Sequence, residues 1–173
     1  WLKQGDEKIY TSEPSIGSVT PAILSAVLND FKAVELSLNG QFTLKGTATE
    51  GFTFADAAGT AITISSVSLP SGKTSSNKVT LNLASSIDVS TSYSVSHATW
   101  GKASVSVGAI MDSKAFSDAY TYAGDDLGNT SSAAKTDFRV WAPTATAVKL
   151  VTYASVSARS GTEVAMTKSD KGT

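Results

Sequence analysis

Hydrophobic residues recur at every second position along most of this 173-residue sequence. Between residues 33 and 38, for example, Val34, Leu36 and Leu38 alternate with smaller or polar residues, which is the period of a half-buried β-strand. The same alternation returns at Phe52/Phe54, Ile62/Ile64, Val79/Leu81/Leu83, Tyr93/Val95 and Val105/Val107. Turn-forming stretches such as ADAAGT and PSGKTSSN separate these runs. Short strands at a spacing of roughly ten residues predict a sandwich of two antiparallel sheets.

We therefore expect an all-β protein in which residues 15–118 form one immunoglobulin-like antiparallel β-sandwich. Between two of the runs, Asn39 and Gly40 predict a tight hairpin turn, because both tolerate the positive φ that such a turn requires. Residues 21–28 fit either a short amphipathic helix, with Thr20 as its N-cap, or a strand. We favour the strand, because the first strand of a sandwich has to pair beside the second.

The pattern changes after Lys114. Residues 119–136 combine paired acids, glycines and a Ser/Ala/Lys-rich patch with little alternation, which predicts a linker. Strand-like runs resume at DFRVWAP, which ends at Pro143 because proline cannot donate to a sheet, and continue in AVKLVTY and EVAM. Residues 137–173 thus predict the truncated beginning of a second β-module, with too few strands to close a stable layer.

Composition excludes several classes of function. The chain has 14 basic and 15 acidic residues and a net charge of −1, so it lacks the clustered basic residues that bind nucleic acid or an anionic membrane. It has no cysteine, which excludes disulfides and thiolate chemistry. No apolar run reaches the ~20 residues of a membrane span. Many Ser and Thr residues and few Lys are typical of exported bacterial proteins and predict an extracellular or cell-surface location.

Asp125 and Asp126 form the most obvious pair of acids. Adjacent residues of an extended segment point to opposite sides, whereas the two carboxylates of a glycosidase face each other across the substrate. We therefore expect a turn or capping role for this pair and no catalytic residue. Asp112 and Asp118 are further oxygen donors of the kind that Ca²⁺ takes, so calcium stays open as an alternative. The spacing is not that of an EF-hand loop, and we predict no cofactor and no metal site.

The single histidine, His97, has the same parity as Tyr93 and Val95 in its run. An inward-facing histidine without an orienting acid is typical of a hydrogen-bonded core or boundary residue. The sequence also has no Gly-x-Ser-x-Gly elbow, phosphate-binding glycine loop or dinucleotide fingerprint. We therefore expect no catalytic triad and no nucleotide cofactor.

Trp1, Trp100 and Trp141 are candidates for stacking on a sugar ring, because a flat indole face fits the apolar face of a pyranose. We select Trp100, which precedes Gly101 in a turn, as the candidate sugar contact. The alternative for each tryptophan is packing in a core.

A block of residues from 122 to 150 resembles a signature of bacterial type I pullulanases, the α-1,6-debranching enzymes of the α-amylase superfamily. The signature has the spacing Tyr-x-Gly-x-Asp-Leu-Gly, and after a spacer Phe-Arg-Val-Trp-Ala-Pro-Thr-Ala and Val-x-Leu. The matching residues are Tyr122, Gly124, Asp126, Leu127, Gly128, Phe138, Arg139, Val140, Trp141, Ala142, Pro143, Thr144, Ala145, Val148 and Leu150. The resemblance implies that residues 137–173 begin a family 48 carbohydrate-binding module and that residues 15–118 are the immunoglobulin-like N2 domain.

Residues 1–14, WLKQGDEKIYTSEP, resemble the end of a family 41 carbohydrate-binding module, a starch and pullulan binder. The aspartate nucleophile, glutamic acid/base and stabilising aspartate of the debranching enzymes have no counterpart in this sequence. The resemblance therefore implies a non-catalytic accessory region of a pullulanase. Its implied partners are an α-glucan, bound through neighbouring modules, and the catalytic barrel of the parent chain.

Two other functions stay open. The chain fits an immunoglobulin-like module of a bacterial surface adhesin, for which further sandwich repeats downstream would be typical. It also fits an autonomous hydrolase that uses Asp125 or Asp126, which predicts turnover of pullulan by the isolated chain.

Overall fold

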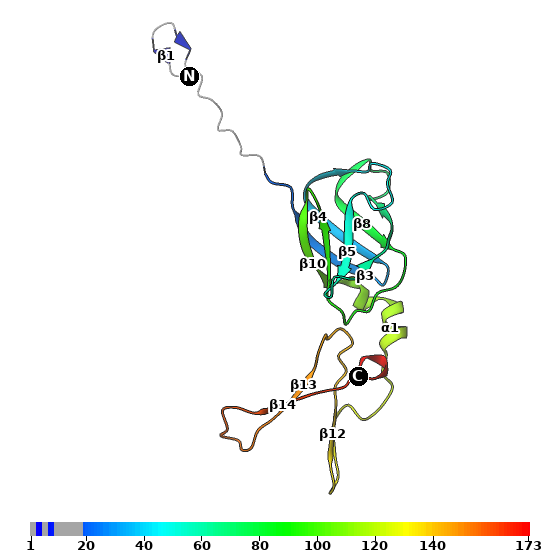
Figure 1. Cartoon of the computed structure of the whole chain (residues 1–173), viewed down its shortest axis with the longest axis vertical. Coiled ribbons are helices and arrows are strands. Elements are labelled where there is room, and N and C mark those ends of the chain that lie inside the picture. The colour runs from blue at the N-terminus through cyan, green and yellow to red at the C-terminus, as the bar shows by residue number, and fades with distance from the viewer. Residues whose placement is uncertain (1–2, 5–6, 9–18) are drawn as a thin grey trace.

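A computed structural model describes residues 3–4, 7–8 and 19–173 (Figure 1). Near the N-terminus, β1 (Lys3–Gln4) pairs antiparallel with β2 (Glu7–Lys8). The other residues of the piece expected over 1–14, including Trp1, lie outside the described residues. The family 41 interpretation of that piece therefore stays a prediction.

Eight strands form a sandwich, and the all-β, immunoglobulin-like fold class is confirmed. The strand order is β6-β5-β9-β10-β3-β4-β8-β7, and every neighbouring pair is antiparallel except β10 with β3. The strands are β3 (Ile23–Asp30), β4 (Ala33–Thr43), β5 (Phe52–Asp56), β6 (Ala61–Ile62), β7 (Ile64–Ser68), β8 (Ser75–Leu83), β9 (Tyr93–His97) and β10 (Gly101–Val107).

Two stretches of chain pass from one sheet of the sandwich to the other. The first half of β10 pairs with β9, whereas Val105–Val107 pair in parallel with β3. On the opposite side, β6 and β7 lie at the two ends of the strand order but are separated in sequence only by Thr63. The chain thus links the two sheets of the sandwich on both sides.

The alternating runs bury the face that their period predicts. Val34, Leu36 and Leu38 are at most 1% exposed. The same parity fills the core from the other strands with Phe52, Phe54, Val79, Leu81, Leu83 and Val95. Removing this apolar surface from water is the main force that stabilises the sandwich.

Residues 21–28 contain most of β3, so the preference for a strand over a helix is confirmed. Strand β3 lies between β4 on one side and β10 on the other. The local signals at Thr20 and Pro21 allowed a helix as well, and pairing on both edges decides for the strand.

The hairpin expected at Asn39 and Gly40 is wrong. Strand β4 runs through both residues to Thr43, and neither residue has a positive φ. The register of β4 against β8 shifts between Ser37 and Phe42, which places an irregularity in the strand where the sequence suggested a turn.

Asn39 and Gly40 instead serve contacts from distant parts of the chain. Asn39 Oδ1 accepts a hydrogen bond from the Ala22 N–H at 2.8 Å, and Asn39 Nδ2 donates to the Thr20 carbonyl at 2.8 Å. A Cβ at Gly40 would lie 3.1 Å from the Trp100 ring, so glycine gives this indole its space. Asn39 fixes the entry to β3, and Gly40 admits an aromatic side chain to the core.

Two short helices, η1 (Ala109–Asp112) and α1 (Lys114–Tyr120), cover one end of the sandwich (Figure 1). The Ser113 hydroxyl caps α1 by accepting a hydrogen bond from the Phe116 N–H at 3.0 Å. Ile110 and Phe116 are buried in the sandwich core. Helix α1 crosses the domain boundary that the sequence analysis placed after residue 118.

The remaining strands form two separate two-stranded sheets. Strand β11 (Gly128–Ser131) pairs with β12 (Thr136–Arg139), and β13 (Lys149–Thr152) pairs with β14 (Thr162–Ala165). A turn of 3-10 helix, η2 (Asp170–Gly172), follows. The stretch expected as a linker, 119–136, thus contains all of β11, and β12 ends at Arg139, earlier than the expected strand. The division into modules at residues 14, 118 and 136 stays a prediction.

Candidate functional site

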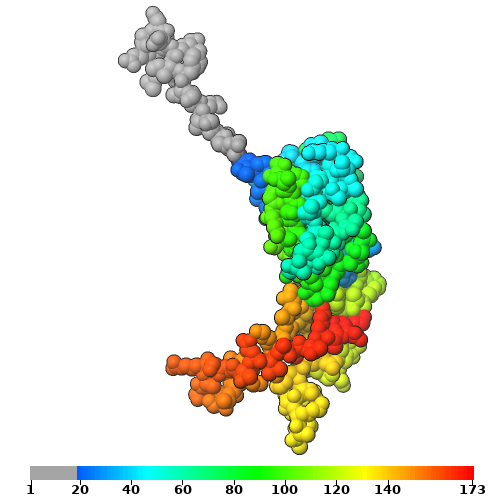
Figure 2. Space-filling view, viewed as in Figure 1, coloured from blue at the N-terminus to red at the C-terminus, as the bar shows by residue number. Residues whose placement is uncertain are grey.

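The contacts between the sandwich and the C-terminal segment, residues 121–173, form the candidate functional site, which we call the joint. The C-terminal segment lies beyond the end of the sandwich that carries α1 (Figure 1). Figure 2 shows its last residues against α1 and the neighbouring end of the sandwich. The joint is built from Tyr120, Trp141 and two lysines, and a cluster around Tyr122 lies beside it within the C-terminal segment.

Tyr120, the last residue of α1, contacts both sides of the joint. Its ring lies 4.9 Å from that of Phe116 and 6.3 Å from that of Phe31, measured between centroids, so it packs on the sandwich. Its carbonyl accepts a hydrogen bond from Trp141 Nε1 at 2.8 Å. Burial raises the pKa of the Tyr120 phenol. Helix α1 therefore ends on a residue whose ring belongs to the sandwich and whose carbonyl binds the C-terminal segment.

Two lysines near the end of the chain also reach the sandwich. Lys168 Nζ donates to Ser90 Oγ at 2.6 Å and lies 3.8 Å from Asp88 Oδ1, while Lys171 Nζ donates to the Asp118 carbonyl at 3.0 Å. Burial opposes the charge on Asp88, but hydrogen bonds from Ser90 and the charge of Lys168 outweigh it and lower the pKa of Asp88. The loop after β8 and the end of α1 thus both contact the last turn of the chain.

Tyr122, Gly124, Asp126 and Arg139 form a compact unit, the Tyr122 cluster. The Tyr122 hydroxyl donates to Asp126 Oδ1 and accepts from Arg139 Nη1 at 2.6 Å. Arg139 Nη1 lies 3.4 Å from Asp126 Oδ2, and the guanidinium carbon lies 5.6 Å from the centroid of the Tyr122 ring. A Cβ at Gly124 would collide with the Tyr122 ring, so only glycine allows the ring to lie across the chain here.

The charges of the Tyr122 cluster are matched. The hydrogen bond to Asp126 raises the pKa of the Tyr122 phenol. The hydrogen bond from Tyr122 and the nearby charge of Arg139 lower the pKa of the Asp126 carboxyl. Asp126 is therefore held as a carboxylate with both oxygens engaged, which is the opposite of the protonated general acid that a glycosidase needs.

Asp126 and Asp137 line one open depression beside β12 together with Thr130, Lys135, Phe138 and Arg139. The two acids are 44% and 62% exposed, and each is paired with a base: Asp126 with Arg139, and Asp137 with Lys135 at 2.8 Å. An open surface with paired carboxylates does not resemble the closed pocket in which two acids flank a glycosidic bond. Asp125 is exposed.

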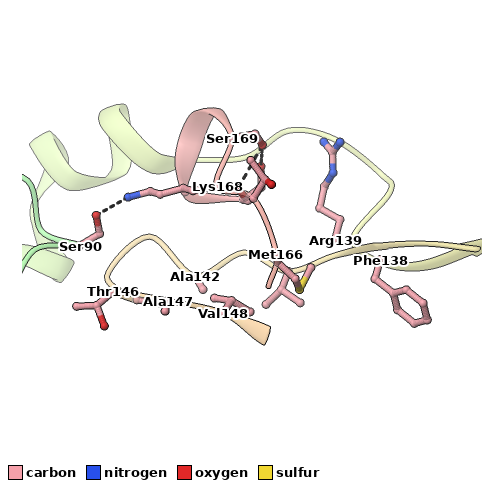
Figure 3. A pocket seen from close by; sticks show the side chains of 15 residues that line it. Ser90, Phe138, Arg139, Ala142, Thr146, Ala147, Val148, Met166, Lys168 and Ser169 are labelled. Carbon is pink, nitrogen blue, oxygen red and sulfur yellow. Dashed lines mark hydrogen bonds between the residues drawn. The ribbon is translucent and has the colours of Figure 1, made fainter. Parts of the chain in front are cut away.

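A pocket of about 370 Å³ opens on the side of the joint (Figure 3). Its apolar wall comes from β12, from the run between β12 and β13, and from Met166 just after β14, and its polar rim comes from the last residues of the chain. The lining residues include Phe138, Val140, Val148, Met166, Lys168 and Ser90. The hydrogen bond from Lys168 to Ser90 crosses one edge of this pocket.

The candidate sugar contact, Trp100, belongs to the sandwich core. It is 9% exposed and packs 6.5 Å from Phe42, measured between ring centroids. A sugar that stacks on an indole needs one face of the ring in solvent, so this position favours the alternative of core packing. Trp141 is 44% exposed and belongs to the joint.

His97 lies at the boundary of the core. Its ring lies 4.7 Å from that of Phe52, and its Nδ1 accepts a hydrogen bond from the Thr99 N–H at 3.0 Å. The expected hydrogen-bonded boundary role is confirmed.

The four aspartates considered for calcium do not gather at one place. Asp118 pairs with Lys114 at 2.6 Å, and Asp126 belongs to the Tyr122 cluster. In residues 3–4, 7–8 and 19–173, no three His, Cys, Asp or Glu side chains lie in an arrangement that could hold a metal ion.

The Tyr122 cluster could not be recognised as a physical unit from the sequence. Its members were visible as a spacing of Tyr, Gly and Asp at every second position followed by a strand with Arg139. The spacing did not show that the tyrosine folds back on the glycine, because that depends on where Arg139 lies in space.

The C-terminal segment is similar to a known protein family. Residues 126–173 match Carbohydrate-binding module 48 (Isoamylase N-terminal domain). The two strand pairs β11–β12 and β13–β14 are therefore similar to a module of this class.

Solved structures extend the similarity to the sandwich. The pullulanase from Anoxybacillus sp. LM18-11 complexed with maltotriose is 30% identical over 86% of this chain and 21% of its own, with a TM-score of 0.64. The pullulanase from Bacillus acidopullulyticus has a TM-score of 0.71 at 21% identity, over 87% of this chain and 31% of its own. Type I pullulanase from Bacillus subtilis str. 168, complexed with maltose, has a TM-score of 0.60 at 23% identity, over 91% and 21%.

The last two structures share the fold, and the first also shares sequence. The chain spans less than a third of the length of each of these pullulanases. No curated protein matches the sequence. The helices in the described part of the chain are too short or too polar to cross a membrane. The chain is thus similar to a part of these pullulanases.

Proposed function

We propose that this chain is the non-catalytic accessory region of a pullulanase that hydrolyses α-1,6-glucosidic branch linkages in pullulan, starch or glycogen. The observation that carries this proposal is the 30% identity to the Anoxybacillus pullulanase over 86% of the chain, across both the sandwich and the C-terminal segment. The match of residues 126–173 to a carbohydrate-binding module supports it independently.

The physical role is to position one module relative to another. The sandwich is a closed unit with its own core, and the joint ties the C-terminal segment to one end of it through Tyr120, Lys168 and Lys171. A rigid spacer sets the distance between a glucan-binding module and a catalytic barrel, which raises the concentration of substrate near the barrel. The residues of the joint are paired with each other, which suits a structural role better than turnover.

The proposed partners are an α-glucan, which neighbouring modules hold, and the barrel of the parent chain. The proposed location is outside the cell or at the bacterial cell surface, where such polysaccharides are met. Fractionation of the source cells followed by detection of the parent protein tests the location. Recovery in the cytosolic fraction would contradict it.

The function is tested on the parent protein that contains this sequence and on a version without residues 1–173. We expect the parent to release reducing sugar from pullulan. The shortened version should keep its kcat on a short soluble branched oligosaccharide, while its kcat/KM on insoluble starch falls at least about tenfold, because linked binding modules no longer concentrate the polymer.

The short oligosaccharide is the control for folding of the barrel. Equal kcat/KM on starch with and without residues 1–173 would contradict the accessory role. The isolated chain is assayed on pullulan in parallel, and we expect no release of sugar. Turnover that is lost in Asp126→Asn would instead support the hydrolase alternative.

A further inference from the structure

The chain from Tyr120, at the end of α1, to Trp141, just beyond β12, is held at three successive points. At its start, the Tyr120 ring packs on Phe31 and Phe116 of the sandwich. Two residues later, the Tyr122 hydroxyl binds Asp126 and Arg139. At its end, Trp141 Nε1 returns to the Tyr120 carbonyl. A stretch that the sequence predicts as a linker is thus closed into a ring of contacts that begins and ends at Tyr120.

We propose that the Tyr122 cluster, Tyr122, Gly124, Asp126 and Arg139, is an orientation-setting device that fixes the direction of the β11–β12 hairpin relative to the sandwich. Arg139 is the last residue of β12 and lies opposite Gly128 of β11 in the register of the hairpin. A bond from Tyr122 to Arg139 therefore holds the hairpin at its base. Without this bond, the direction of the hairpin is set by the backbone of the connection, by the contact of Trp141 and, less directly, by the contacts of Lys168 and Lys171 with the sandwich.

The geometry of the cluster favours one arrangement over others. The guanidinium of Arg139 both donates to the Tyr122 hydroxyl at 2.6 Å and lies near the face of the same ring, 5.6 Å from its centroid. Such a planar group satisfies both contacts only in a narrow range of orientations, and lysine cannot reproduce them. Gly124 is needed as well, because any side chain there would push the Tyr122 ring away from Asp126 and Arg139.

The inference rests on the proposed function for its consequence, because a fixed direction matters in a chain that positions modules. Its physical content concerns this chain alone. A chain unrelated to pullulan hydrolysis can still have a fixed joint, and a pullulanase region can have a loose one. The test below measures the joint directly and the pullulan assays above measure the function, so the two can fail separately.

The test measures distances between two nitroxide labels, one on the sandwich and one on the hairpin. The chain has no cysteine of its own, so Lys73→Cys in the turn before β8 and Ala133→Cys in the β11–β12 turn give two unique attachment sites. Both positions are exposed. On the otherwise unchanged chain, we expect double electron–electron resonance to give a single narrow distribution of distances between the two labels.

Tyr122→Phe and Arg139→Ala should each broaden this distribution roughly twofold, because the hairpin then samples more than one direction. Arg139→Lys should also broaden it, since the charge alone does not restore the planar contacts. The matched controls are Tyr153→Phe and Arg159→Ala, which alter the same residue types at exposed positions of the β13–β14 loop. They should leave the width unchanged.

Unchanged widths in Tyr122→Phe and Arg139→Ala would overturn the proposal. Near-ultraviolet circular dichroism of the buried Trp100 reports whether the sandwich is intact in each variant. A variant that loses this signal has unfolded, and the comparison then uses Gly124→Ala, which disturbs the cluster while its own residue lies on the surface. A width equal to that of the unchanged chain in Gly124→Ala would also overturn it.

Discussion

The sandwich and the C-terminal segment use strands of similar sequence, but they differ in what those strands can bury. In the sandwich, Phe54 is 1% exposed and Val95 is fully buried. In the C-terminal segment, Phe138 is 44% exposed and Val164 is 52% exposed, although both belong to alternating runs.

The difference comes from the presence of a second layer. Each sheet of the sandwich faces another, so the apolar face of a strand is covered. The strand pairs β11–β12 and β13–β14 are separate two-stranded sheets, and such pairs have little stability by themselves. The joint therefore contributes more to the stability of the C-terminal segment than to that of the sandwich. In the sandwich, the second sheet already supplies such contacts.

The largest expected effect comes from removing the same ring in the two regions. Phe54→Ala should lower the free energy of unfolding by about 3–5 kcal/mol, because it removes a buried ring and leaves a cavity. Phe138→Ala is the matched control, and we expect a change within about 0.5 kcal/mol because this ring is already half in solvent. Urea unfolding followed by tryptophan fluorescence measures both. Similar losses in the two variants would show that the C-terminal segment has a core of its own.

A smaller effect is expected at Glu50, which closes the turn after β4. The residue as a whole is 4% exposed, and its carboxylate accepts hydrogen bonds from the backbone N–H groups of Lys45, at 2.6 Å, and of Gly46 and Thr47, both at 2.8 Å. The bond from Lys45, with those from Thr47 and Gly46, lowers the pKa of Glu50 below its ordinary value of 4.5.

A carboxyl whose pKa is lower in the folded than in the unfolded state stabilises the fold above the unfolded value, and this contribution disappears as the pH falls through the folded value. Glu50→Gln should therefore be less stable than the unchanged chain at neutral pH, and the difference should shrink below pH 4.5. Thermal unfolding across this range measures it. A difference that stays constant with pH would contradict the role of the charge.

The buried face of a strand could be predicted from the sequence, whereas the role of a glycine within the same strand could not. The parity of Val34, Leu36 and Leu38 was sufficient to assign the buried face of β4, because the pleat of a strand fixes which side chains share a face. The role of Gly40 could not be foreseen, since the residue that needs its space, Trp100, comes from another strand connection. Local turn chemistry and distant packing favour the same residue type there for different reasons.

The candidate site divides in the same way. The resemblance identified Tyr122, Gly124, Asp126 and Arg139 as members of a sequence signature. It did not show that these four residues contact one another. Tyr122 and Arg139 are separated by 17 residues, and their contact depends on the turn of the β11–β12 hairpin. Spacing along a chain predicts partners within one element, whereas partners from two elements require the fold.

The cap of α1 should have a smaller effect, because it concerns the hydrogen bonds of one hydroxyl, which accepts from the Phe116 N–H and donates to the Ile110 carbonyl at 2.6 Å. Ser113→Ala removes the acceptor for the Phe116 N–H and should cost about 1 kcal/mol. Ser117→Ala, at an exposed position within the same helix, is the matched control and should have little effect. Urea unfolding compares the two. An equal loss in both variants would contradict the role of the cap, because alanine within a helix should not destabilise it.

The smallest effects are expected from the exposed ion pairs, and they should be equally small in both regions. Lys78 lies 2.9 Å from Glu35 on the sandwich, and Lys149 lies 2.6 Å from Glu163 on the β13–β14 pair, with all four side chains between 42% and 58% exposed. Water and salt screen such pairs, so double-mutant cycles with alanine should give coupling energies of about 0.2–1 kcal/mol in each case. A coupling of several kcal/mol for Lys149 and Glu163 alone would mean that charge compensates for the missing layer. Equal small values would leave the joint as the main constraint on the C-terminal segment.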